Sequence, residues 1–280
     1  MKVFKSAKSI QNHMIALKKN GVKIGFVPTM GYLHEGHLSL IRRARKDNNI
    51  VVLSIFVNPT QFGPNEDYNR YPRNFKMDLK HARKEGVDIV YYPSAAEMYP
   101  EHYYTYVNVE VLSDVLCGQV RPGHFRGVAT VCTKLFNIIQ PDVVYMGQKD
   151  AQQAVIIKQM VKDLNMPLKI KVLPVIREQG GLAMSSRNEY LSKDDRKKAL
   201  VISQSLRAAD ALFKKGAGVN KIKKQVKNIL LKEPQIKVEY VEIVDLKLLN
   251  PVVKIKKPSL LAVAVWISGV RLIDNVILKP

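Results

Sequence analysis

Two histidines three residues apart occur in the stretch PTMGYLHEGHLSL, residues 28–40. The preceding residues 23–27 have the composition of a buried strand, so His34 and His37 would lie on the first turn of a following helix. A helix N-terminus presents free N–H groups and a positive dipole potential, and Gly31 would let the main chain approach a ligand closely. Imidazoles at that place can donate hydrogen bonds to phosphate oxygens, so we expect a phosphate-binding turn.

Two other interpretations of this histidine pair are open. Histidines at positions i and i+3 could share a metal ion, although the sequence lacks HExxH spacing, and no cysteine or third histidine lies nearby. The pair could also be structural, with every ring nitrogen satisfied inside the protein. The glycine turn and the predicted helix N-terminus favour phosphate over both alternatives.

Two further polar stretches follow apolar segments that read as strands. In FVNPTQFGPNEDYNRYPR, residues 56–73, the amides of Asn58 and Gln61 can both donate and accept, which suits a small polar substrate. In YMGQKDAQQAV, residues 145–155, Lys149 could contact a phosphate, and Asp150 a ribose hydroxyl or a metal ion. Gln153 in the same stretch would face back toward the strand ends.

A fourth stretch, GGLAMSSRNEYLS at residues 180–192, combines two hydroxyls with an arginine. Ser185, Ser186 and Arg187 together would suit a triphosphate, because a guanidinium binds phosphate through paired hydrogen bonds. The preceding Gly-Gly pair is typical of a hinge that lets a loop close over a substrate. A helix cap is the simpler alternative for these hydroxyls.

The elements that must position these stretches alternate along the first 175 residues. Short segments rich in Val and Ile predict buried parallel strands, and amphipathic segments between them predict helices. The predicted strands are residues 23–27, 50–57, 88–92, 143–146 and 169–175, and the predicted helices are 36–47, 74–86 and 151–164. This alternation predicts an α/β fold with a Rossmann-like, doubly wound parallel sheet, which binds ligands at the carboxyl ends of its strands.

The pattern changes after residue 175, which predicts a domain at 1–175 and a smaller α+β C-terminal domain at 176–280 that acts as a lid. We expect one long helix over 192–216 with Ser192 as its N-cap, and a second basic helix near 221–232. Residues 235–246 and 259–278 read as strands, with Gly269 at a hairpin turn or a bulge. Residues 104–116 have the pattern of an edge strand that could pair with a second copy of the chain.

Composition narrows the class of protein. Of 280 residues, 46% are hydrophobic and 25% charged, which is typical of a globular protein, and no apolar segment is long enough to span a membrane. The N-terminus lacks the pattern of a secretory signal, and Cys117 and Cys132 stand alone, so we expect a reduced, cytoplasmic protein. The net charge of +21 favours anionic partners, but lysines dominate without interleaved aromatic residues, so we expect a solvated surface and no nucleic-acid partner.

Together the stretches resemble a known family. The HxGH turn and the late MSSR loop resemble the nucleotidyltransferase superfamily shared with class I aminoacyl-tRNA synthetases. With RPGHFRGVATVCTKLFN at residues 121–137 between them, their order and spacing are similar to the pantothenate synthetase (pantoate–β-alanine ligase) family. The dense resemblance runs from about residue 22 to residue 195, and beyond it only a general similarity to that family's lid domain remains.

This resemblance implies a ligase of pantothenate and coenzyme A biosynthesis that uses ATP and Mg²⁺. Pantoate would react with ATP to give pantoyl adenylate and pyrophosphate, and β-alanine would then displace AMP to give pantothenate. The family also implies a homodimer. A lid that closes over the water-sensitive adenylate would serve this chemistry.

The resemblance also implies roles for individual residues. The catalytic residues would be His34, His37, Lys149 and Arg187, with His37 nearest the α-phosphate. The nucleotide site would comprise these four with Met30, Gly31, Gly147, Asp150, Ile176, Met184, Ser185 and Ser186. The pantoate and β-alanine site would comprise Pro28, Thr29, Asn58, Gln61, Arg121 and Gln153, with His124 as a further member. Asp78 and Asp150 are candidate Mg²⁺ ligands, and no metal ligand is assigned.

One departure from the family pattern concerns the hinge. The family's loop often reads Arg-Glu-x-Asp-Gly, whereas this chain has REQGG, with Gly180 in the acidic place. Three rival functions also fit part of the sequence: another adenylyl- or cytidylyltransferase with the same turn, a class I synthetase, and a nucleic-acid-binding protein. The amides Gln61 and Gln153 favour an uncharged diol over a second phosphate, and charge alone does not account for four phosphate-type loops.

Overall fold

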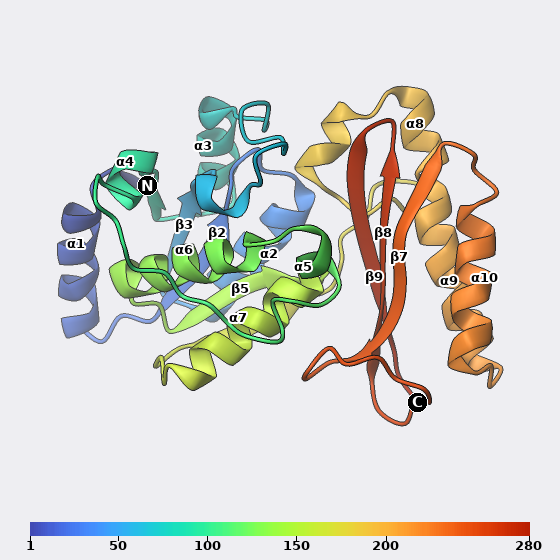
Figure 1. Cartoon of the computed structure of the whole chain (residues 1–280). Coiled ribbons are helices and arrows are strands. Elements are labelled where there is room, and N and C mark those ends of the chain that lie inside the picture. The colour runs from blue at the N-terminus through green and yellow to red at the C-terminus, as the bar shows by residue number, and fades with distance from the viewer.

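The chain folds around two β-sheets of different kinds (Figure 1). A computed structural model describes all 280 residues. The larger sheet has six strands in the order β1-β4-β3-β2-β5-β6, all of them parallel, and the smaller has three antiparallel strands in the order β7-β8-β9. The fold is therefore α/β with a doubly wound parallel sheet and a smaller C-terminal sheet, as the sequence predicts.

The predicted strands and helices of the parallel sheet correspond to observed elements within a few residues, and the structure adds elements that were not predicted, among them the helices at 7–19 and 124–139. The strands are β1 Lys2–Phe4, β2 Ile24–Thr29, β3 Ile50–Ile55, β4 Ile89–Tyr91, β5 Val143–Gly147, β6 Lys169–Leu173, β7 Ile236–Asp245, β8 Ser259–Ile267 and β9 Val270–Leu278. The α-helices are α1 Ala7–Lys19, α2 Glu35–Asp47, α3 Phe75–Lys84, α4 Ala95–Met98, α5 Cys117–Val120, α6 His124–Ile139, α7 Ala151–Asp163, α8 Lys193–Lys198, α9 Leu200–Lys214 and α10 Val219–Leu230. Short 3₁₀ helices are η1 Pro59–Gln61, η2 Gln148–Asp150 and η3 Ser186–Tyr190.

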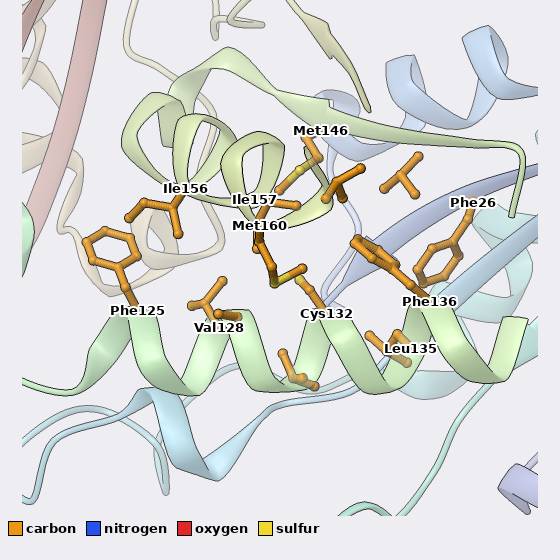
Figure 2. Packing of buried hydrophobic residues seen from close by; sticks show 14 of the residues in the cluster. Phe26, Phe125, Val128, Cys132, Leu135, Phe136, Met146, Ile156, Ile157 and Met160 are labelled. Carbon is orange, nitrogen blue, oxygen red and sulfur yellow. The ribbon is translucent and has the colours of Figure 1, made fainter. Parts of the chain in front are cut away.

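Helices cover both faces of the parallel sheet, which explains why its strands are continuously apolar. On one face, α2 and α3 pack on side chains such as Val27 and Leu53. On the other, α1, α6 and α7 pack on side chains such as Phe26 and Val52. Figure 2 shows how α6 meets α7 there, with Cys132 facing Met160 in the apolar layer between them.

The strand order creates a crevice where ligands bind in such sheets. From β2 the chain proceeds to β3 and β4 on one side, and later returns to place β5 on the other side of β2. The loops after β2 and β5 therefore leave the sheet in opposite directions and open a gap between them. The turn that carries the two histidines follows β2, and the Lys149 turn follows β5, so both lie at this point.

The C-terminal sheet lies between the large domain and the helices α9 and α10 (Figure 1). In β8, alternate side chains such as Leu261 and Val263 pack on these helices, while Leu260 and Ala262 join the core of the large domain. The β8–β9 turn contains Ser268 and Gly269, both with positive φ, so the predicted hairpin turn is confirmed. The domain boundary at 175/176 stays a prediction.

Two predicted elements differ from those observed in the single chain, and the pairing of residues 104–116 with a second copy stays a prediction. Residues 104–116 form no strand in the single chain; they wrap the large domain, and their apolar residues Val109, Leu112 and Leu116 are buried in its core. The predicted helix over 192–216 is divided at Ala199 into α8 and α9, although Ala199 itself keeps helical φ and ψ. The Ser192 N-cap is confirmed, since its side chain accepts a hydrogen bond from Asp195 N.

Candidate active site

A cleft of about 1070 Å³ opens between the parallel sheet and the C-terminal sheet, at the carboxyl ends of β2, β3 and β5. All four polar stretches contribute to it. The predicted site residues that line it are Pro28, Thr29, Met30, His34, His37, Asn58, Gln61, Arg121, His124, Gly147, Lys149, Asp150, Gln153, Ile176, Met184, Ser185, Ser186 and Arg187. Gly31 lies in the turn behind this wall and does not line the cleft.

Gly31 and Asp78 shape the turn after β2. Gly31 has φ +85°, and a Cβ there would lie 2.9 Å from both Asp78 Oδ2 and a methyl carbon of Ile55, so glycine is required. The carboxylate of Asp78 accepts hydrogen bonds from Tyr32 N at 3.0 Å and from Leu33 N at 2.7 Å. Asp78 is only 2% exposed. This argues against Asp78 as a Mg²⁺ ligand, because both oxygens hold the main chain of the turn.

The two histidines cap α2 reciprocally. His34 Nδ1 accepts from Gly36 N at 3.1 Å, and His37 Nδ1 accepts from His34 N at 3.4 Å, an imidazole version of the capping box. The rings stack with their centres 4.0 Å apart. Because Nδ1 is an acceptor in both rings, the proton of each neutral ring resides on Nε2. The pair therefore offers two N–H donors to an anion in the cleft.

Burial keeps both imidazoles neutral in the ligand-free protein. It lowers the pKa of His34 to about 4, and the positive charge of Lys149 adds to this effect. Burial, together with His34 and Lys149, also lowers the pKa of His37 well below its usual value. The site is thus a desolvated pocket with an ammonium and two N–H donors, and an anion entering it would raise both pKa values.

The amide of Gln61 is oriented by a buried neighbour. Asn58, which is 1% exposed, donates through Nδ2 to Gln61 Oε1 at 3.1 Å and to Gly127 O at 3.1 Å. Its Oδ1 accepts from Tyr99 OH at 2.8 Å. Asn58 is therefore fully engaged by the protein, which favours a positioning role over the substrate contact predicted for it.

The RPGH segment supports Gln61 from the other side. The pKa of His124 is lowered to about 4 by burial and by the charge of Arg121, so the ring is neutral. Its Nδ1–H donates to Gln61 O at 2.7 Å, while its Nε2 accepts from Arg121 Nη1 at 3.2 Å. Arg121 also donates through Nε to Glu66 Oε1 at 2.7 Å, in a pair with little exposure. The predicted contact of Arg121 with substrate stays a prediction.

The turn η2 presents Lys149 opposite the histidines. The ammonium lies 3.8 Å from Asp150 Oδ1, and the Lys149 side chain is largely buried. The main chain of η2 is held by the C-terminal sheet, since Asn275 Nδ2 donates to Gln148 O at 2.9 Å and to Lys149 O at 3.0 Å. Asn275 was not predicted as a site residue, and its only signal in the sequence is the polar pair Asp274-Asn275 inside the apolar strand RLIDNVIL.

The MSSR loop closes the cleft from the C-terminal side. Arg187 donates through Nε and Nη2 to Asp67, at 2.9 and 2.7 Å, and so ties the loop to the large domain. This pairing lowers the pKa of Asp67 against the opposing effect of burial. Because Nε and Nη2 are engaged, Nη1 of Arg187 remains available to an anion. Asp67 is a second residue of the site that was not predicted.

The Gly-Gly pair before this loop forms a tight turn. Gly180 has φ +104° and Gly181 has φ +111°, conformations that other residues rarely adopt. The turn belongs to a short hairpin in which Met184 N donates to Ile176 O at 3.0 Å and Glu178 N donates to Leu182 O at 2.8 Å. Gly180 therefore serves a defined turn in place of the acidic residue of the family pattern.

The fold and the site define a class of protein: a Rossmann-like α/β enzyme whose HxGH turn and MSSR loop lie together at one cleft, where Ser186 Oγ donates to Tyr32 O at 3.4 Å. The pantoate–β-alanine ligase family profile matches residues 2–277. The chain therefore belongs to the pantoate–β-alanine ligase family, and it is a ligase that joins pantoate to β-alanine to form pantothenate.

Individual relatives span the whole chain. This chain is 56% identical to the pantothenate synthetase of a Sulfurihydrogenibium species, and the match covers 99% of each chain. It is 53% identical to the pantothenate synthetase of Thermotoga petrophila, and that match covers 99% of this chain and 100% of the relative. The crystal structure of the Thermus thermophilus enzyme matches with a TM-score of 0.96 at 42% identity over both full chains. The structure of the Francisella tularensis enzyme, complexed with β-γ ATP and β-alanine, matches with a TM-score of 0.82 at 36% identity. The match covers 99% of this chain and 97% of that one. No helix of this chain is long and apolar enough to cross a membrane.

Proposed function

We propose that this ligase uses ATP and that its reaction proceeds through pantoyl adenylate in the cleft between the two domains. One observation carries the proposal: the Nε2–H groups of His34 and His37 lie at a helix N-terminus across the sheet's crossover point from Lys149. Three donors that line one cleft would suit one anion position. Such a position would suit the α-phosphate of ATP, where pantoate forms the first new bond.

In the first step, a carboxylate oxygen of pantoate attacks the α-phosphorus while the bond to pyrophosphate breaks and pyrophosphate departs with the electron pair. Negative charge grows on the phosphate oxygens, and prearranged donors stabilise it most in a desolvated site. His34, His37 and Lys149 would serve the α-phosphate. Ser185, Ser186 and Arg187 Nη1 would serve the departing pyrophosphate.

Pantoate would lie beside the apolar wall that α6 gives to the cleft. Val131, Cys132 and Leu135 line the cleft there, and they suit the two methyl groups of the substrate. Gln61 and Gln153 would bind its hydroxyls, and Pro28, Thr29 and Met30 would close the floor. Gly147, Asp150, Ile176 and Met184 would line the adenosine.

In the second step, the neutral amine of β-alanine attacks the acyl carbon, loses a proton, and displaces AMP. Gln61 would lie near the incoming amine. The MSSR loop, tied to Asp67, would exclude water from the adenylate during this step.

Mg²⁺ would accompany ATP and neutralise part of the triphosphate charge. The chain has no group of three His, Cys, Asp or Glu side chains that could hold a metal ion by themselves. This favours a cation bound mainly by phosphate oxygens, with Asp150 at the rim of the cleft as the remaining protein candidate.

A homodimer and a cytoplasmic location complete the proposal. Residues 103–108 belong to no helix or strand of the chain, and Tyr104 among them is 80% exposed. Such a segment can pair with its copy in a second chain. Cys117 and Cys132 are both unpaired thiols, which suits a reducing compartment.

The test is to incubate purified protein with ATP, pantoate, β-alanine and Mg²⁺, and to measure pantothenate, AMP and pyrophosphate. We expect AMP, pyrophosphate and pantothenate in equal amounts, with none of them formed without pantoate. Formation of ADP and phosphate in place of AMP and pyrophosphate would overturn the adenylate route. Light scattering tests the dimer in the same preparation.

A further inference from the structure

We propose that Asn275, in the C-terminal sheet, is a positioning residue for Lys149, so that the small domain builds part of the catalytic site. This inference rests on the role proposed above for Lys149. It goes beyond that role because it assigns a function to a strand that belongs to the other domain.

The contacts of Asn275 use its whole amide group. Nδ2 donates both of its hydrogens, to Gln148 O at 2.9 Å and to Lys149 O at 3.0 Å, and Oδ1 accepts from Gln148 Nε2 at 3.1 Å. The side chain is only 4% exposed. A buried amide with every partner in place fixes the groups around it, because any movement leaves an unpaired polar group.

These bonds fix the orientation of two successive peptide groups, and the side chain of Lys149 branches from the Cα atom between them. Lys149 must direct its ammonium toward the cleft from a short turn between β5 and α7. A long, flexible lysine side chain can lose its position when its main chain rotates. Asn275 removes that freedom at the point where the side chain begins.

The neighbouring residue connects the same strand to the other side of the cleft. Asp274, 3% exposed, accepts from Arg177 Nη1 at 2.6 Å and from Arg177 Nη2 at 3.0 Å, and it also accepts from Asn275 N at 2.7 Å. Arg177 begins the hairpin that leads to the MSSR loop. Adjacent residues of β9 therefore hold the Lys149 turn and the loop that carries Arg187, and the strand sets the two cations relative to each other.

A double-mutant cycle tests the inference. Lys149→Ala removes one donor to the α-phosphate and should lower kcat/KM for pyrophosphate release about 100-fold. Asn275→Ala should lower it about tenfold through displacement of Lys149. The double variant should then lie within about twofold of Lys149→Ala alone, because a displaced lysine and an absent lysine are equivalent.

Additive losses, near 1000-fold in the double variant, would overturn the inference while leaving the proposed function intact. A Lys149→Ala enzyme with full activity would instead overturn the role of Lys149 itself. If Asn275→Ala does not fold, Gln148→Ala can replace it in the cycle, because it removes one hydrogen bond to Asn275. Gln148→Ala should lower kcat/KM by a smaller factor, and it should have no further effect in a Lys149→Ala background.

The matched control is Asp245→Ala in the same sheet. Asp245 accepts main-chain hydrogen bonds from Lys247, Leu248 and Asn250, and it does not line the cleft. This variant should lose thermal stability and keep its kcat/KM. An equal loss of activity in the control would mean that any weakening of the small sheet lowers the rate, and would overturn a specific role for Asn275.

Discussion

Replacing Asp78 with Asn separates two roles for a buried carboxylate beside the catalytic turn. Its oxygens accept from Tyr32 N and Leu33 N, at 3.0 and 2.7 Å, inside a site that is 2% exposed. Asn keeps the shape and one acceptor, but its NH₂ group then faces a main-chain N–H. The loss of one charge-assisted bond and the burial of an unpaired donor cost about 2–4 kcal/mol of unfolding free energy.

That loss should lower the Tm by roughly 4–8 °C in a chain of this length. Because the turn leads directly into His34, we also expect kcat to fall about tenfold through misplacement of the histidine pair. The concentration of Mg²⁺ that gives half-maximal rate should change by less than about twofold, since the carboxylate holds main chain and no cation.

The assay is a thermal melt together with a steady-state Mg²⁺ titration of wild type, Asp78→Asn and the surface control Asp163→Asn. Asp163 ends α7 and is exposed, so its variant should match wild type in both measurements. The reasoning is refuted if Asp78→Asn keeps its Tm while its Mg²⁺ requirement rises tenfold or more. That result would restore the carboxylate as a metal ligand.

Three further predictions concern the histidines and the MSSR loop. His34→Asn keeps an N-cap acceptor, so it should unfold within about 0.5 kcal/mol of wild type and yet lose pyrophosphate release, whereas an equally active variant would show that the ring has no part in chemistry. The free energy of unfolding of the ligand-free protein should rise with pH between about 4 and 6.5. Burial lowers the pKa of His34 and His124 to about 4, so the unfolded chain binds more protons than the folded one in that window. Denaturant midpoints measured across this range check the prediction, and an unchanged pH dependence in His34→Asn would contradict it. Arg187→Lys cannot bond both oxygens of Asp67, so the KM for ATP should rise about tenfold with little change in Tm; an unchanged KM would mean that the guanidinium does not meet the nucleotide.

Sequence patterns predicted the parallel sheet because buried parallel strands carry a composition that is visible without the structure. The segments 23–27, 50–57 and 143–146 became β2, β3 and β5, and the turns after them meet at one edge. For residues 104–116 the same argument predicts a strand that the single chain does not form. Their apolar residues Val109, Leu112 and Leu116 join the core that α6 and α7 share with the sheet, and local periodicity does not distinguish such a segment from a strand.

The loops predicted to form the site could be found because each follows a predicted strand and carries its own polar residues. The side chains that hold those loops are different, since Asp67, Asp78 and Asn275 act on residues up to 127 positions away in sequence. Nothing in a local pattern names such a partner. A polar residue within an apolar strand, as in RLIDNVIL, signals only that some partner exists.

The most direct test of the central claim is isotope exchange between pyrophosphate and ATP in the absence of β-alanine. If pantoyl adenylate forms at the histidine turn, labelled pyrophosphate should enter ATP when pantoate and Mg²⁺ are present, and should not when pantoate is omitted. The exchange should be lost in His37→Ala. Exchange that requires β-alanine, or that proceeds without pantoate, would contradict the account.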